Sequence, residues 1–275
     1  MSVCRDACVE GYSAVADREA TSKCWAHTLG GCDRMSGEHV FSSAIFKAGC
    51  SCPVIVEGVQ RIRQGAPTRG AEKSNILCVH HNSALSPLDE TIGKIARFQA
   101  ESNDKNYQGS LIIKGELLER WLLKTVINNA AAGWAAPVKW QPSPSITRAI
   151  FGLEPVPDGF GLYSVDGIDP AHRPSGGVSF TAIYTQTPHG NILAGAYVAV
   201  HGMPLLASFR ADLVQMLEAG HIPSFTTRFS PNGLKHLYHP GAIVIDRKEG
   251  APVFMGLSWG GLLRYADGTT APHRD

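Results

Sequence analysis

Apolar residues recur along the chain with two different periods, which divide it into two regions. At helical spacing they predict helices at 86–100 and 116–128. A short apolar run at 75–79 predicts a strand before the first of these helices. From residue 160 onward, β-branched and aromatic residues run between Gly, Pro and Asn, which predicts a mostly antiparallel sheet with one helix near 208–219.

Composition marks a boundary between these regions. Residues 131–159 are rich in Trp, Pro, Gly and Ser, which is typical of a linker. We therefore expect an N-terminal domain at 1–130 and a β-rich domain at 160–275. With 275 residues, of which 44% are hydrophobic, the chain is long enough for two ordinary domains or one large one.

The cysteines are confined to the N-terminal region: Cys4, Cys8, Cys24, Cys32, Cys50, Cys52 and Cys78. An odd number of cysteines in a chain of this length, with charges where a signal peptide would have its apolar core, favours metal binding in a reducing compartment over a disulfide scaffold. No apolar run approaches the roughly 18 residues that a membrane helix needs. We therefore expect a cytoplasmic protein without a membrane partner. Cys50 and Cys52 match no partner pair and are expected to be thiols.

Two short CxxH motifs, CWAH and CVHH, form the strongest metal-binding pattern. The ligands that they offer are Cys24, His27, Cys78 and His81. Zinc prefers four nitrogen and sulfur ligands in a closed tetrahedral site, and two short-spaced pairs supply such a set. The sequence leaves two alternatives open, since Cys32 could replace His27 and His80 could replace His81.

The surroundings of these motifs resemble a known enzyme family. Between them lies GEHVF at 37–41, and Asn82 directly follows the second motif in NILCVHHN. This order resembles the HNH (ββα-metal) endonuclease superfamily, and in particular its phage recombination endonuclease VII-like branch. The similar part covers about residues 22–100. The resemblance implies an α+β protein with a zinc-stapled ββα-metal module, followed by helices and a C-terminal, mostly antiparallel β-rich domain.

The resemblance also implies roles for three residues. His39 would be the general base that deprotonates the attacking water. Glu38 and Asn82 would hold one catalytic divalent ion, Mg²⁺ or Mn²⁺, while the zinc would be structural. The expected activity is metal-dependent hydrolysis of phosphodiester bonds in nucleic acid, with DNA as the expected substrate. The chain departs from the family in having Glu38 where Asp is frequent, and in a longer gap between His39 and Asn82.

A basic segment falls within this longer gap. Arg61, Arg63, Arg69 and Lys73 lie within thirteen residues that contain one acidic residue, Glu72. They could contact phosphates beside the active site, or form a solvated loop. The net charge of +1 for the whole chain gives no general attraction for nucleic acid.

Two other classes of function fit the same pattern. A zinc-stabilised module could bind nucleic acid or protein with weak catalysis or none, which Glu38 and the near-zero net charge favour. A toxin or defence effector could instead use the C-terminal region to gate the nuclease. That region is also the expected contact for a regulatory partner or for a homodimer. The remaining histidines, including His236 and His239, are expected to be structural or surface residues.

Overall fold

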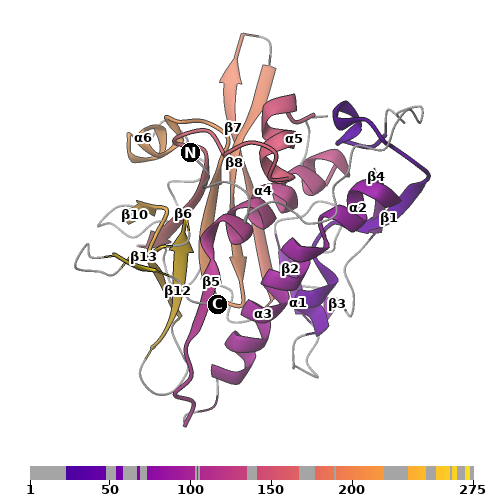
Figure 1. The fold of residues 1–275 in the computed structure, drawn as a ribbon. Helices are drawn as coiled ribbons and strands as arrows, with labels where there is room; N and C mark the ends of the chain where they lie inside the picture. The colour runs from indigo at the N-terminus through magenta and orange to yellow at the C-terminus, as the bar shows by residue number, and fades with distance from the viewer. Residues whose placement is uncertain are drawn as a thin grey trace.

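The computed structural model describes residues 23–47, 54–57, 67–68, 73–102, 104, 106–134, 141–166, 177–188, 190–219, 235–245, 252–260, 262–264 and 270–272. These residues form a mixed α+β fold with largely antiparallel sheets, as the sequence predicts. Figure 1 shows helix α4 (Gly115–Ala131) in the middle of the molecule, between the short N-terminal strands and the long strands of the second half.

The cysteine-rich segment is built around a two-stranded sheet. Strand β1 (Met35–His39) pairs antiparallel with β4 (Lys73–Cys78), and the register shifts between Ser36 and Glu38. The short 3-10 helix η1 (His27–Leu29) precedes β1, and α1 (Ser43–Lys47) follows it. Helices α2 (Val79–Ala84) and α3 (Ser86–Ser102) follow β4 directly. The segment therefore has two paired strands followed by helices.

Most of the predicted elements are confirmed. The helices predicted at 86–100 and 116–128 are α3 and α4, and the strand predicted at 75–79 is β4. The helix expected near 208–219 is the shorter α6 (Leu213–Glu218). Among the described residues, no helix is both long and apolar enough to cross a membrane.

A seven-stranded sheet has the order β10-β6-β9-β8-β7-β2-β3. Its strands are β2 (Val54–Glu57), β3 (Pro67–Thr68), β6 (Gly161–Asp166), β7 (Val178–Thr187), β8 (Gly190–Val200), β9 (Met203–Ser208) and β10 (Lys235–Tyr238). Strands β7 and β8 form a long antiparallel hairpin. On its other side β7 pairs in parallel with β2, where Val56 lies opposite Val178. The first half of the chain therefore extends the sheet of the second half.

A third sheet contains β11 (Ala242–Ile245), β12 (Val253–Trp259), β13 (Leu262–Arg264) and β14 (Thr270–Pro272). Here too the first half of the chain contributes a strand, because β5 (Leu111–Lys114) pairs in parallel with β12. These long-range parallel pairings are features that the alternation of apolar residues does not indicate.

One hydrophobic core includes residues of both halves, from Cys24 to Trp259. The expected linker contributes to it: residues 144–150 form helix α5 (Pro144–Ile150), which begins where the Ser143 hydroxyl accepts a hydrogen bond from the Ile146 amide. Directly after this helix, Phe151 packs against Trp25, with 5.9 Å between the ring centroids. The described part of this segment is therefore a packed element rather than an open connection.

Candidate metal centre and the residues around it

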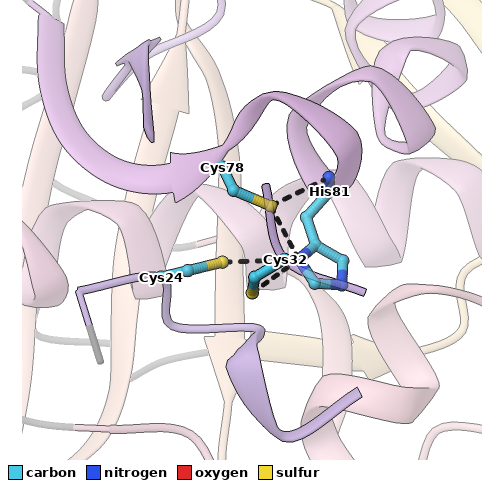
Figure 2. A group of neighbouring side chains, drawn as sticks. All are labelled: Cys24, Cys32, Cys78 and His81. Carbon is cyan, nitrogen blue, oxygen red and sulfur yellow. Dashed lines mark hydrogen bonds between the residues drawn. The ribbon is translucent and has the colours of Figure 1, made fainter. Parts of the chain in front are cut away.

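Four buried side chains converge where η1, β4 and α2 meet. They are Cys24, Cys32, Cys78 and His81, whose potential ligand atoms all lie within 4.8 Å of one another. Figure 2 shows the three sulfur atoms gathered around the His81 ring. His81 Nδ1 lies 3.4, 3.6 and 3.1 Å from the sulfur atoms of Cys24, Cys32 and Cys78. Tetrahedral zinc, with its usual bond lengths, would separate sulfur and nitrogen ligands by roughly 3.5 Å. This Cys3His group could therefore hold a metal ion such as zinc.

The turn that holds Cys78 and His81 is fixed by backbone hydrogen bonds. Cys78 ends β4 and caps α2, where its sulfur accepts a hydrogen bond from the His81 amide. The next amide, of Val79, donates to the carbonyl of Arg34. The amide of His80 donates to the carboxylate of Asp33. A CxxH motif at a strand end thus presents both of its ligand atoms on one side.

Cys32 takes the place that the sequence predicted for His27. Gly30 and Gly31 both have a left-handed backbone, with φ of 76° and 68°, which side-chain-bearing residues rarely adopt. They turn the chain after η1, so that Cys32 returns to Cys24. His27 lies outside the group, and its Nδ1 donates to the carbonyl of Cys24 at 2.9 Å. The sequence left this alternative open, and the glycine pair before Cys32 was the signal that favoured it.

The electrostatics of the group favour one thiolate. Hydrogen bonding to the side chain of Cys24 lowers the pKa of the Cys78 thiol, against the effect of burial, and His81 lowers it further. The same Cys78 contact, together with burial, raises the pKa of Cys24. None of the three cysteines forms a disulfide, so no disulfide competes with metal binding in this group. Because thiolate is the metal-binding form, the lowered pKa of Cys78 favours its binding to a metal ion.

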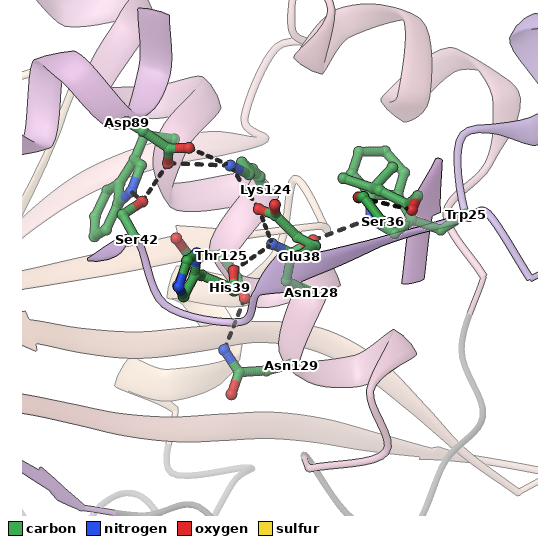
Figure 3. A network of polar contacts seen from close by, with 12 residues as sticks. Trp25, Ser36, Glu38, His39, Ser42, Asp89, Lys124, Thr125, Asn128 and Asn129 are labelled. Carbon is green, nitrogen blue, oxygen red and sulfur yellow. Dashed lines mark hydrogen bonds and ion pairs between the residues drawn. The ribbon is translucent and has the colours of Figure 1, made fainter. Parts of the chain in front are cut away.

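Glu38 and His39 are neighbours at the end of β1, but their side chains lie in different surroundings. Glu38 is 3% exposed, and its Oε1 lies 2.9 Å from the ammonium nitrogen of Lys124. The same nitrogen donates to both carboxylate oxygens of Asp89, at 3.0 and 2.9 Å. Figure 3 shows Lys124 between these two carboxylates. His39 is partly exposed.

The charges of this cluster are coupled. Burial on its own would lower the pKa of Lys124, but the carboxylates of Asp89 and Glu38 outweigh it and raise that pKa. Burial raises the pKa of Glu38, and the charge of Lys124 offsets only part of this effect. The side chain of Lys124 is therefore a charged ammonium inside the molecule.

These contacts bear on the divalent ion that the resemblance implies. Mg²⁺ binds through carboxylate oxygens and keeps several waters, so its ligands need access to solvent. Glu38 does not fit this role, because its carboxylate is buried and paired with Lys124. Asn82, the other expected ligand, lies on α2 beside His81 and is partly exposed. We therefore assign no chemistry to a divalent ion held by Glu38.

His39 lies in a basic environment. Lys73 is directly opposite His39 in the β1–β4 pairing, and both Lys73 and Lys47 are exposed. Burial lowers the pKa of His39, and the charge of Lys73 lowers it further. A neutral imidazole next to positive charges suits proton abstraction near a phosphate.

The rest of the basic segment, Arg61, Arg63 and Arg69, lies outside the described residues, as do Cys50 and Cys52. Lys73 is thus the one member of that segment whose neighbourhood is described, and it lies beside His39. Of the predicted patch, the structure thus brings Lys73 next to the predicted base.

Comparisons with models of protein families, with curated proteins and with solved structures gave no match for this chain. The fold and the site define an α+β protein with a candidate Cys3His metal centre. The relation to the HNH superfamily stays a prediction from the motifs.

Proposed function

We propose that this protein is a zinc-stapled endonuclease that hydrolyses phosphodiester bonds in nucleic acid, with DNA as the expected substrate and His39 as the general base. The proposal is carried by the position of His39. His39 ends β1, is partly exposed, lies opposite Lys73 in the strand pairing, and has its pKa lowered by the positive charges of Lys73 and Lys47. The partner strand of β1 ends at Cys78, so a metal in the Cys3His group would fix the sheet that carries His39.

The chemistry follows from these placements. His39 would take a proton from water as the water oxygen attacks phosphorus, and the bond from phosphorus to the leaving oxygen would break, with that oxygen taking a proton from solvent. Lys73 and Lys47 would attract the phosphate and stabilise its developing charge. Zinc, held by three sulfurs and one nitrogen, would supply structure rather than catalysis, because four protein ligands leave it no open position.

Cutting of supercoiled plasmid tests the proposal, with and without added Mg²⁺ or Mn²⁺. We expect His39→Ala to lower the rate about 10²- to 10⁴-fold, the usual contribution of a general base. The matched control is His27→Ala, which removes a histidine outside the Cys3His group and should leave cutting unchanged. Both variants should keep the zinc content of the wild type. Cutting that survives His39→Ala, in protein with full zinc, would remove His39 from the mechanism.

A second candidate is a zinc-stabilised module that binds nucleic acid without cutting it. The ion pair between Lys124 and Glu38 favours it, because this pair occupies the carboxylate that would otherwise hold a catalytic ion. This candidate predicts no cutting by zinc-loaded protein, but salt-dependent DNA binding that Lys73→Ala weakens. A gated effector would instead begin to cut when its second component is added.

A further inference from the structure

The ammonium group of Lys124 has the surroundings of a bound cation. Three carboxylate oxygens lie within hydrogen-bond distance of its nitrogen: Oε1 of Glu38 at 2.9 Å, and Oδ1 and Oδ2 of Asp89 at 3.0 and 2.9 Å. An ammonium group has three protons to donate, so these oxygens satisfy it completely. The side chains of Lys124 and Glu38 are 2% and 4% exposed, so their ion pair is shielded from water, whereas the side chain of Asp89 is 33% exposed.

Neighbouring polar groups donate further hydrogen bonds to the two carboxylates. The amide of Asn128 donates to Oε1 of Glu38 at 3.4 Å. The hydroxyl of Ser42 donates to Asp89 and accepts a hydrogen bond from the indole of Trp121 at 2.8 Å. The cluster is therefore a connected network in which each carboxylate has a cationic and a neutral donor.

A divalent ion at this place would have to displace the ammonium. Displacement would leave a charged Lys124 buried without its carboxylate partners, which is strongly unfavourable. Helix α4 also packs against α3 and contributes residues to the core, and the side chain of Lys124 is buried there. The ammonium of Lys124 therefore occupies the space between the two carboxylates as long as α4 keeps its position.

We propose that the ammonium of Lys124 takes the place of a divalent cation between Glu38 and Asp89, and that this protein binds no metal ion through Glu38. Lys124 is then a positioning residue, which ties the end of β1 and the first turn of α3 to α4. Asn128, one turn further along α4, donates to the backbone carbonyl of His39 at 3.4 Å, so the same helix face also holds the candidate base. The proposal stands on these contacts and does not depend on whether the protein cuts nucleic acid.

Binding of Mn²⁺ to the zinc-loaded protein, followed by electron paramagnetic resonance of free Mn²⁺, tests it directly. Glu38→Gln keeps the shape of the side chain and removes its charge, and it should leave the Mn²⁺ affinity of the protein unchanged. Lys124→Met keeps the stem and removes the ammonium, and it should create a new Mn²⁺ site. The double variant Lys124→Met/Glu38→Gln should lose that site. A wild-type Mn²⁺ site that Glu38→Gln weakens about tenfold or more, as loss of a charged ligand would, overturns the proposal.

A folded Lys124→Met protein without a new Mn²⁺ site would also overturn it, since the carboxylates would then not form a cation site. If a variant fails to fold, a measurement on the wild-type protein still tests the proposal. The ammonium protons of Lys124 should exchange slowly with solvent, so that its ¹⁵N resonance is observed. The chemical shift of this resonance should be unchanged when Mg²⁺ is added. Loss or displacement of that resonance by Mg²⁺ would show that the ion competes with Lys124.

Discussion

Each of the four side chains in the Cys3His group would supply one ligand atom to a metal ion. Among the described residues, these four form the one group of three or more Cys, His, Asp and Glu side chains close enough together to hold a metal ion. Loss of one ligand should lower the zinc-binding free energy, which for a complete structural zinc site is about 10 kcal/mol or more near neutral pH.

Cys32→Ser should abolish stoichiometric zinc binding and lower the melting temperature of the protein. The physical reason is the loss of one of three thiolates at a buried site. Metal analysis by mass spectrometry and thermal unfolding check this. His27→Ala is the control, since it removes one hydrogen bond to the Cys24 carbonyl and should cost about 1 kcal/mol or less. The opposite result, zinc lost in His27→Ala and kept in Cys32→Ser, would restore the pairing that the CxxH motif predicted.

His39 should give the cutting reaction an acid limb below its ordinary pKa of 6.5, because burial and then Lys73 lower the pKa of this imidazole. A general base works when it is unprotonated, so activity should be present above the limb and fall as pH decreases through it. Lys73→Ala removes a charge that lowers the pKa, and it should move the limb toward higher pH. Cutting rates measured across pH check both statements, and a limb above 6.5 in the wild type would contradict them.

At the scale of elements, helix α4 connects the candidate site with the C-terminal sheet. Lys124 and Asn128 face β1, as described above. At the start of the helix, Gly115 lies against the ring of Trp259 from β12. That ring also stacks on His239, with 3.9 Å between centroids, and donates to the carbonyl of Pro240 at 2.8 Å. Two different sheets therefore set the position of one helix.

Gly115→Ala should destabilise the protein by about 1–3 kcal/mol, although alanine is the better helix former, because overpacking outweighs propensity. A Cβ at this position would meet the indole at 2.5 Å, and the stacked ring has little room to shift. Gly256→Ala in β12 is the matched control, since its added methyl group finds an ordinary contact with Ile112 at 3.4 Å. Chemical denaturation of both variants measures the difference. Equal stability of the two would show that Trp259 moves freely.

At the scale of the whole molecule, described residues on the two sides of the expected boundary contact one another. Phe41, from the N-terminal segment, packs edge-on against Phe180 of β7 at 6.1 Å. Gln99 of α3 donates to the carbonyl of Val200 at the end of β8. Strands β2 and β5 belong to sheets of the second half. Shared strands and a shared core favour cooperative unfolding.

Removal of the metal by a chelator should therefore weaken more than the cysteine-rich segment. We expect the backbone amides of β7 and β8 to lose protection from hydrogen exchange together with those of β1 and β4, because these strands share one core. Hydrogen exchange with mass spectrometry on the full chain measures this. Unchanged protection of β7 and β8 in metal-free protein would show that the second half is stable on its own, as the composition of residues 131–159 suggested.

The sequence by itself determined the features that depend on local spacing. The apolar period predicts α3 and α4, and the strand end at Cys78 with His81 three residues later predicts half of the metal group. These signals are local because helix hydrogen bonds and tight turns join residues a few positions apart.

Only the tertiary structure decided the partners that lie far apart along the chain. It selected Cys32 over His27, paired Glu38 with Lys124, and joined β2 to β7. The physical reason is that burying a charge or a strand edge requires a partner, and the nearest partner in space is set by how both halves pack.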